Sequence, residues 1–116
     1  MTPTAPARKA YRTRSPGEAR RSDVRRDDVR DVFRALGNET RRDILEILHR
    51  HGGPMTSQRI AEPFGMTWQA ISRHLRVLTE AGLITCTEHG RDRAYNLKED
   101  RLHEVVGAWI TTLDGD

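Results

Sequence analysis

Residues 66–84, MTWQAISRHLRVLTEAGLI, combine an apolar helical repeat with polar side chains that could recognise DNA bases. On a helix with ~100° per residue, Ile71, Leu75 and Leu78 fall on one side and must face a core. The opposite side carries Gln69, Ser72, Arg73, Arg76 and Glu80, and the flanks carry Thr67, Trp68 and His74. Glutamine can pair bidentately with adenine, arginine with guanine, and serine with a base or a phosphate. This polar side therefore predicts a surface that reads double-stranded DNA.

Three helices are expected before this segment, the third of them short. The first starts near Asp27 and stops at Gly37, and its apolar residues recur three and four positions apart: Val29, Val32, Phe33 and Leu36. Asn38 is a suitable N-cap for the second helix, whose core side holds Ile44, Leu45 and Leu48. The HGGP of residues 51–54 ends that helix, because glycine and proline both interrupt it.

A third, short helix precedes the DNA-reading segment. Thr56 or Ser57 can cap it, and Gly65 closes it. Thr67 then caps the quoted helix, which ends at Gly82. A short helix, a glycine turn and a capped second helix form a helix-turn-helix, whose second helix enters the major groove. Taken alone, such a polar side is more often that of a merely solvated helix, and it is the order of the elements that favours DNA.

A hairpin and a last helix complete the predicted domain. Residues 83–89 and 93–97 alternate in polarity and flank the turn GRD, so they are expected to be strands. Arg91 and Arg93 lie beside that turn, where a wing would reach the flanking backbone or the minor groove. The last helix begins near Glu99 and carries an apolar stripe: Leu102, Val105, Val106, Trp109 and Leu113. The predicted fold class is mainly α (α+β), a winged helix-turn-helix with a C-terminal β-hairpin wing.

Length and charge indicate one small domain with a basic tail. The chain has 116 residues, of which 35% are hydrophobic and 32% charged, so it can bury only one modest core. Residues 1–30 hold nine Lys/Arg and four Asp/Glu, a net charge of +5, whereas the remaining residues carry a net charge of −2. We expect a disordered basic tail over 1–26 and a DNA-binding and dimerisation domain over 27–116. The tail is either a solvated leader or an arm that lies along phosphates or in a minor groove.

The expected compartment is the cytoplasm. No apolar run approaches the ~20 residues of a membrane helix, and no secretory signal is visible. The single cysteine, Cys86, rules out an internal disulfide framework and fits a reducing environment.

Three segments together resemble the ArsR-type winged-helix repressors of bacteria and archaea. These are VFRALGNETRRDILEIL, MTWQAISRHLRVLTEAGLI and GRDRAYNL, which occur in this order and at the expected separations. The resemblance covers roughly Val32 to Leu113. It implies a homodimer that binds a palindromic DNA operator and represses transcription of its own or an adjacent operon.

The resemblance also assigns roles to residues of this chain. The recognition helix corresponds to 67–79 and the wing to 85–97. DNA-facing positions of the helix fall on Gln69, Ser72 and Arg73, and Thr67 takes the phosphate-contacting helix start. Arg76, Arg91 and Arg93 are expected to set register and salt dependence. The implied dimer interface pairs the first and last helices through Val29, Val32, Phe33, Leu102, Val106, Trp109 and Leu113.

Two further residues of the recognition helix, Trp68 and His74, lie next to the base-reading positions. Trp68 departs from the family pattern, which has a polar residue there. It packs against the core edge, stacks on a sugar or contacts a thymine methyl group, and packing is the more ordinary interpretation. His74 lies on a flank, so we expect a half-buried packing histidine that can reach a phosphate, rather than a metal ligand or a catalytic base.

No metal site or cofactor is expected. The third helix, SQRIAEPFG, lacks the Cys-x-Cys box of the family's arsenic and cadmium sensors. Asp100 and His103 stand without the second ligand pair of the zinc sensors, and the histidines of HRH (49–51) are expected to be solvated. The chain therefore resembles the metal-independent branch of the family, and it does not identify an effector.

Two other classes of function fit the sequence less well. A winged-helix protein-interaction module without specific DNA binding remains the alternative, because the part after the tail carries a net charge of −2 and because of Trp68. An enzyme is not expected, since Ser72 and His74 would point ~200° apart on the helix. The chain also has no glycine-rich phosphate loop and no candidate catalytic residues.

Overall fold

The computed structural model describes residues 24–115, and residues 1–23 of the expected tail lie outside them. The order of the elements matches the sequence prediction, with one strand added. The elements are α2 (Arg26–Leu36), α3 (Glu39–His51), β1 (Met55–Thr56), α4 (Ser57–Ala61), the 3-10 turn η1 (Glu62–Phe64), α5 (Trp68–Glu80), β2 (Ile84–His89), β3 (Asp92–Leu97) and α6 (Glu99–Leu113). The predicted winged helix-turn-helix, an α+β fold, is thereby confirmed.

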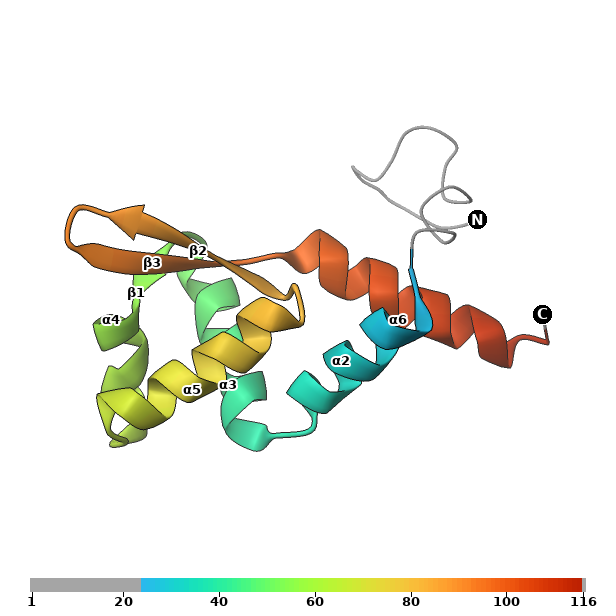
Figure 1. Cartoon of the computed structure of the whole chain (residues 1–116), viewed down its shortest axis with the longest axis horizontal. Coiled ribbons are helices and arrows are strands. Elements are labelled where there is room, and N and C mark those ends of the chain that lie inside the picture. Colours follow the sequence, from blue (N-terminus) through green and yellow to red (C-terminus); the bar gives the residue numbers. More distant parts are fainter. Residues whose placement is uncertain (1–23, 116) are drawn as a thin grey trace.

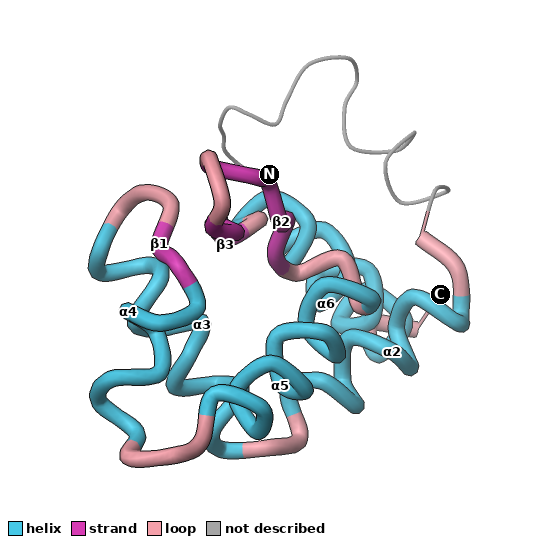
Figure 2. The backbone as a smooth tube through the Cα atoms, turned by 60° about the vertical axis from the view of Figure 1, so that its left-hand side comes forward, coloured by secondary structure: helices cyan, strands magenta, loops and turns pink. Residues whose placement is uncertain are grey.

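The molecule is elongated, with principal extents of 44 × 25 × 20 Å. The β2–β3 hairpin projects at one end, and α6 extends past the body at the other (Figure 1). Both ribbon and tube views place α2 alongside α6 (Figures 1 and 2). Helices α3, α4 and α5 lie between these two ends. The DNA-reading helix predicted from sequence therefore belongs to the body of the molecule (Figure 1).

Side-chain caps start the three central helices where the sequence predicted. The side chain of Asn38 accepts a hydrogen bond from the backbone N–H of Arg41 at 3.1 Å. Thr56, rather than Ser57, caps α4. The Thr67 hydroxyl accepts from the backbone N–H of Ala70 at 3.1 Å and so fixes the first turn of α5. Each cap satisfies a backbone donor that the helix cannot bond internally.

The turn between α4 and α5 depends on a glycine. Gly65 has φ of 62°, in the left-handed region that other residues adopt only at a steric cost. It reverses the chain after η1 so that α5 can start three residues later, at Trp68. The expected glycine turn of the helix-turn-helix is therefore present, at the predicted position.

The wing is a three-stranded antiparallel sheet in the order β1-β3-β2. Strand β2 pairs with β3 from Ile84↔Leu97 to His89↔Asp92, as a hairpin requires. The added strand, β1, pairs with the inner half of β3 through Met55↔Tyr95. It was not predicted, because two residues are too few to show the alternation of a strand. Its pairing ties the base of the wing to the start of α4.

The core lies beneath α5 and the base of the wing. Ile71, Leu75 and Leu78 are each at most 1% exposed, so the predicted core side of α5 is confirmed. They pack in one cluster with buried residues of the other elements, among them Val32, Ile44, Leu48, Ile60, Leu83, Ile84 and Val105. Since the apolar side of α5 is fully used by this core, its polar side faces outward.

Candidate nucleic-acid interface

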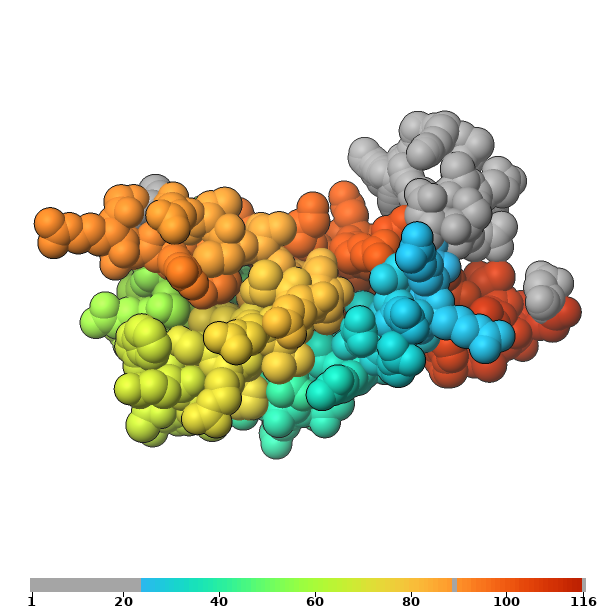
Figure 3. All heavy atoms as spheres, in the orientation of Figure 1, coloured from blue at the N-terminus to red at the C-terminus, as the bar shows by residue number. Residues whose placement is uncertain are grey.

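The polar side of α5 lies on the molecular surface beside the hairpin (Figure 3). Gln69, Arg73 and Arg76 are exposed and Ser72 is half-buried. Thr67, whose hydroxyl caps the helix, is exposed at its start. The helix therefore presents amide, hydroxyl and guanidinium groups over about two turns, a donor and acceptor set that suits base edges and phosphates.

The start of α5 also exposes apolar surface. Trp68 is 59% exposed, and the neighbouring Met66 is 38% exposed. The interpretation that Trp68 packs against the core edge is therefore wrong. Trp68 is the first residue of α5, and in the turn before it Phe64 packs against the core cluster. The indole is left available to a partner of the helix.

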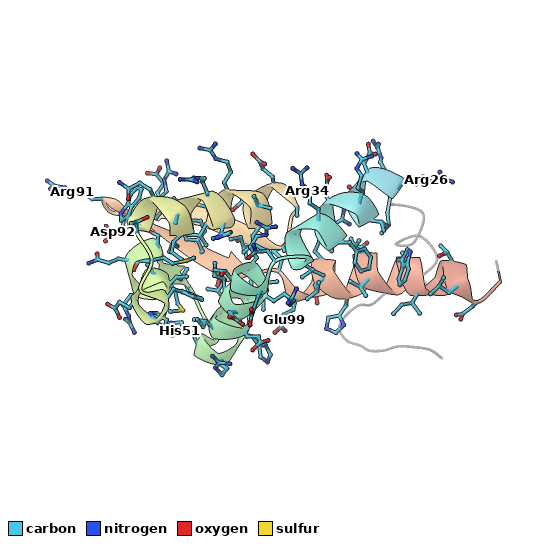
Figure 4. The ribbon with its side chains drawn as sticks, turned by 90° about the horizontal axis from the view of Figure 1, so that it is seen from below. Arg26, Arg34, His51, Arg91, Asp92 and Glu99 are labelled. Atoms are coloured by element: carbon cyan, nitrogen blue, oxygen red, sulfur yellow. The ribbon has the colours of Figure 1, made fainter. Side chains whose placement is uncertain are left out.

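The wing carries its two predicted arginines on the outside. Arg91 lies at the turn and Arg93 on β3, and both are exposed. Figure 4 shows the Arg91 side chain extending away from the body at the outer end of the hairpin, next to Asp92. Strand register places Glu88 opposite Arg93. Acidic neighbours therefore offset part of the positive charge at the wing, and Arg91 reaches furthest from the body.

His74 is half-buried, as expected for a packing histidine. Its Nδ1 atom lies 3.3 Å from a guanidinium nitrogen of Arg41 on α3. Burial lowers the pKa of His74 below its usual 6.5, and the charges of Arg41 and Arg73 lower it further. His74 is therefore neutral at pH 7, and the contact with Arg41 was not predicted from the sequence.

Aromatic and aliphatic side chains remain exposed where α2 meets α6. The rings of Phe33 and Trp109 meet edge to face with centroids 5.1 Å apart. Both are close to 40% exposed, and Ile110 and Leu113 are 49% and 65% exposed. Ile110 was missed because it lies ~100° around the helix from Trp109, outside the apolar stripe read from the sequence.

The other predicted interface residues lie deeper. Val29, Leu102 and Val106 are half-buried and pack against the core cluster, and Val32 has no exposed surface. Val32 therefore belongs to the core beneath the exposed side chains of α2 and α6. We define the apolar face of α2 and α6 by the four exposed residues Phe33, Trp109, Ile110 and Leu113.

Ion pairs join α2 to α6 beside this apolar face. The Arg101 guanidinium lies 3.0 Å from Asp28 on α2 and 2.9 Å from Glu104 on α6. The Asp28 carboxylate also accepts a hydrogen bond from the backbone N–H of Arg25 at 3.0 Å. That N–H is the main cause that lowers the pKa of Asp28, and Arg101 adds to it. A pair so far apart in sequence has no local signal, and it was missed.

The histidines 49 and 51 are both exposed, and His49 contacts Glu99 at the start of α6. Between residues 24 and 115, no three His, Cys, Asp or Glu side chains gather closely enough to hold a metal ion. In the same part of the chain, no helix is long and apolar enough to cross a bilayer.

Comparison with known proteins identifies the arrangement. A family model described as a helix-turn-helix domain matches residues 30–87. The transcriptional repressor SdpR of Bacillus subtilis is 36% identical over 82 residues, which cover 71% of this chain and 88% of that protein. A crystal structure of an ArsR family transcriptional regulator superposes with a TM-score of 0.68 and 30% identity, covering 76% of this chain and 88% of the other.

A more distant structure shares the fold. It is the solution structure of a homodimeric winged helix-turn-helix DNA-binding domain from Mycobacterium bovis, with a TM-score of 0.62 and 23% identity. It covers 89% of this chain and 93% of that one.

Proposed function

The chain belongs to the ArsR family of winged helix-turn-helix, DNA-binding transcriptional regulators, and from this premise we propose that it is a homodimeric repressor of its own or an adjacent operon. As a member of a family of regulators, it is not an enzyme. The palindromic operator is read by two copies of α5 in successive major grooves, ~34–36 Å apart. The observation that carries the proposal is the outward polar side of α5, opposite three fully buried core residues.

Base recognition is assigned to Gln69, Ser72 and Arg73. Their exposure and spacing support this role, since all three lie on the outward side of one helix. Thr67 lies at the helix start, where backbone N–H groups and the helix dipole attract a phosphate. Trp68 contacts the DNA next to Thr67, through a sugar or a thymine methyl group.

Backbone contacts are assigned to Arg76, Arg91 and Arg93, which set register and salt dependence. His74 is assigned a single possible contact with the DNA backbone. Its Nδ1 faces Arg41, so only Nε2 remains to donate a hydrogen bond to a phosphate.

The homodimer forms through the apolar face of α2 and α6. Four large apolar side chains exposed together support this assignment, because a single small domain gains by covering such a patch. Val29, Val32, Leu102 and Val106 hold the two helices together beneath that face.

Repression by this protein is proposed to be independent of metal. The support is the sequence of α4, Ser57–Ala61, which has no cysteine where the family's arsenic and cadmium sensors have a pair. Cys86, the one cysteine of the chain, is half-buried on β2. The effector that releases the DNA is therefore sought among ligands other than thiol-binding metals.

The test is fluorescence anisotropy of the full chain on duplex DNA from upstream of its own gene, titrated across salt and against a scrambled duplex. Tight binding by a dimer that the scrambled duplex does not displace supports an autoregulating repressor. Equal displacement by both duplexes overturns it. The exposed Trp68 and Met66 would then favour a protein-interaction module without specific DNA binding.

A further inference from the structure

The Arg41 side chain, which belongs to α3, connects α2 with α5, two helices that are far apart in the sequence. Its backbone belongs to the first turn of α3, where its N–H bonds to the cap residue Asn38. Its guanidinium group reaches back to the end of α2 and across to α5. One side chain thereby links its own helix, α3, to two others, α2 and α5.

Three different nitrogens of Arg41 make these contacts. Nε donates to the Ala35 carbonyl at 2.8 Å, and Nη2 donates to the Arg34 carbonyl at 3.1 Å. Nη1 lies 3.3 Å from Nδ1 of His74 on α5. Both carbonyls are in the last turn of α2, where the helix dipole favours a cation, and the Arg34 carbonyl also accepts a hydrogen bond from the backbone N–H of Gly37 at 3.2 Å. The guanidinium is therefore held at α2 by two bonds and offers its third nitrogen to α5.

The contact with Arg41 determines the tautomer and the protonation state of His74. A guanidinium group only donates hydrogen bonds, so Nδ1 of His74 must be the acceptor. His74 is then neutral with its proton on Nε2. The burial and the neighbouring charges of Arg41 and Arg73 favour the same neutral form.

We propose that Arg41 is a positioning residue for DNA recognition, which holds α5 at a fixed angle to α2 through His74. The proposal rests on the proposed function of α5. His74 directly follows Arg73, which is assigned to base recognition, and Arg34 directly follows Phe33 of the apolar face. Arg41 therefore connects the backbone of the proposed dimer helix with the proposed DNA-reading helix by direct contacts.

Arg42 provides a matched control. It is the next residue of α3, and its guanidinium also donates to a carbonyl at the end of α2, that of Leu36. It is exposed, and within residues 24–115 its side chain forms no hydrogen bond or ion pair with α5. Arg41→Ala and Arg42→Ala thus remove the same charge from the same turn, and only the first removes the bridge to α5.

The first experiment is long-range ¹H–¹⁵N NMR of the histidine rings in the free full-length protein. Wild type is expected to show His74 protonated on Nε2. Arg41→Ala is expected to raise the pKa of His74 and to populate the Nδ1-protonated tautomer, whereas Arg42→Ala leaves both unchanged. Wild-type protein with the proton on Nδ1 would overturn the proposal. No DNA is involved, so this result is independent of the proposed function.

The second experiment measures affinity for a duplex that wild-type protein selects from random-sequence DNA. Arg41→Ala is expected to bind this duplex about tenfold more weakly than Arg42→Ala does. Both variants should bind a random duplex equally, because both lose one charge. Equal loss on the selected duplex would refute a positioning role. Failure to select any duplex counts against the proposed function and leaves the NMR result standing.

A second pair of variants tests the bridge if Arg41→Ala does not fold. His74→Asn keeps an acceptor oxygen near the position of Nδ1, and His74→Leu removes the acceptor. Hydrogen exchange of the α5 amides in the free protein should be several-fold faster in His74→Leu and restored in His74→Asn. Equal exchange in both variants would contradict the proposal.

Discussion

The two surfaces proposed to bind partners use their polar and apolar groups in opposite ways. Apart from Trp68 at its start, the large apolar residues of α5 are buried or half-buried and its charges point outward, and within residues 24–115 neither Arg73 nor Arg76 forms an ion pair. Where α2 meets α6, Arg101 is paired with Asp28 and Glu104, and the apolar side chains are exposed instead. Unpaired cations suit a polyanion, whereas an exposed apolar patch suits a second protein surface.

The interactions that hold the helices of these two surfaces in place also differ. Helix α5 is held by its buried apolar side and by one half-buried contact, that of His74 with Arg41. Helices α2 and α6 are held to each other by packed apolar residues and by the Arg101 ion pairs. A substitution on one surface therefore leaves intact the residues that hold the helices of the other surface in place.

The largest effect is expected from a charge on the apolar face. Leu113 is 65% exposed, so Leu113→Glu leaves the folded monomer intact but places a carboxylate in the proposed dimer interface. We expect a monomer by analytical ultracentrifugation and, from the loss of bivalent binding, about 100-fold weaker binding to the selected duplex. Thr111→Glu adds the same charge ~200° away on α6 and should remain dimeric. A dimeric Leu113→Glu protein would place the interface elsewhere.

On α5, two exposed arginines are expected to differ in what they recognise. Arg73→Ala should weaken binding to the selected duplex by ~1–3 kcal/mol and relax its sequence preference. Arg76→Ala should weaken selected and random duplexes alike and lower the salt slope by about 1. Anisotropy titrations over salt measure both quantities. If the two variants behave alike, α5 holds the DNA backbone without reading bases.

How far the sequence predicts the structure differs between the two regions. The core side of α5 and its Thr67 cap were both predicted, because helical periodicity and capping act between residues that are neighbours in the chain. The exposed apolar face was predicted only in part. Periodicity shows on which side of a helix an apolar residue lies. It cannot show which of two neighbouring apolar residues is buried in the core, as Val32 is, and which stays exposed, as Phe33 does.

Contacts between distant segments were not predictable in this way. Arg41 and His74 are 33 positions apart, and Asp28 and Arg101 come from opposite ends of the domain. Both pairs arise only when three-dimensional packing brings their helices together. The exposure of Trp68 was not predictable from periodicity either, because Trp68 lies on a flank of α5 at its first residue.

A smaller effect is expected at the ion pairs between α2 and α6. Asp28→Asn keeps an oxygen for the Arg25 N–H and removes the charge facing Arg101, so we expect a loss of ~1 kcal/mol in unfolding free energy at pH 7. The pKa of Asp28 lies below its usual 3.8, so the stabilisation is fully present above pH 3.8 and is lost as pH falls through the lowered pKa. Urea denaturation at neutral and acidic pH measures this difference.

Asp27→Asn is the matched control for that measurement. Asp27 lies 2.9 Å from Arg30, but both side chains are at least 70% exposed. An exposed pair of this kind contributes little, so the variant should lose less stability than Asp28→Asn at pH 7. Equal losses would mean that the Asp28–Arg101 pair contributes no more than a surface ion pair.

The smallest effect on stability is expected for a substitution of Trp68. This tryptophan lies on α5, whereas the other, Trp109, lies on the apolar face of α2 and α6. Trp68→Ala should change the unfolding free energy by no more than ~0.5 kcal/mol, because most of the side chain is already in solvent. In a Trp109→Phe background, Trp68 is the only tryptophan, and its fluorescence should change when the selected duplex is added. A stability loss of about 3 kcal/mol, typical of a buried aromatic residue, would instead show that Trp68 packs in the core. Unchanged fluorescence on binding would remove Trp68 from the DNA contacts and leave base recognition to Gln69, Ser72 and Arg73.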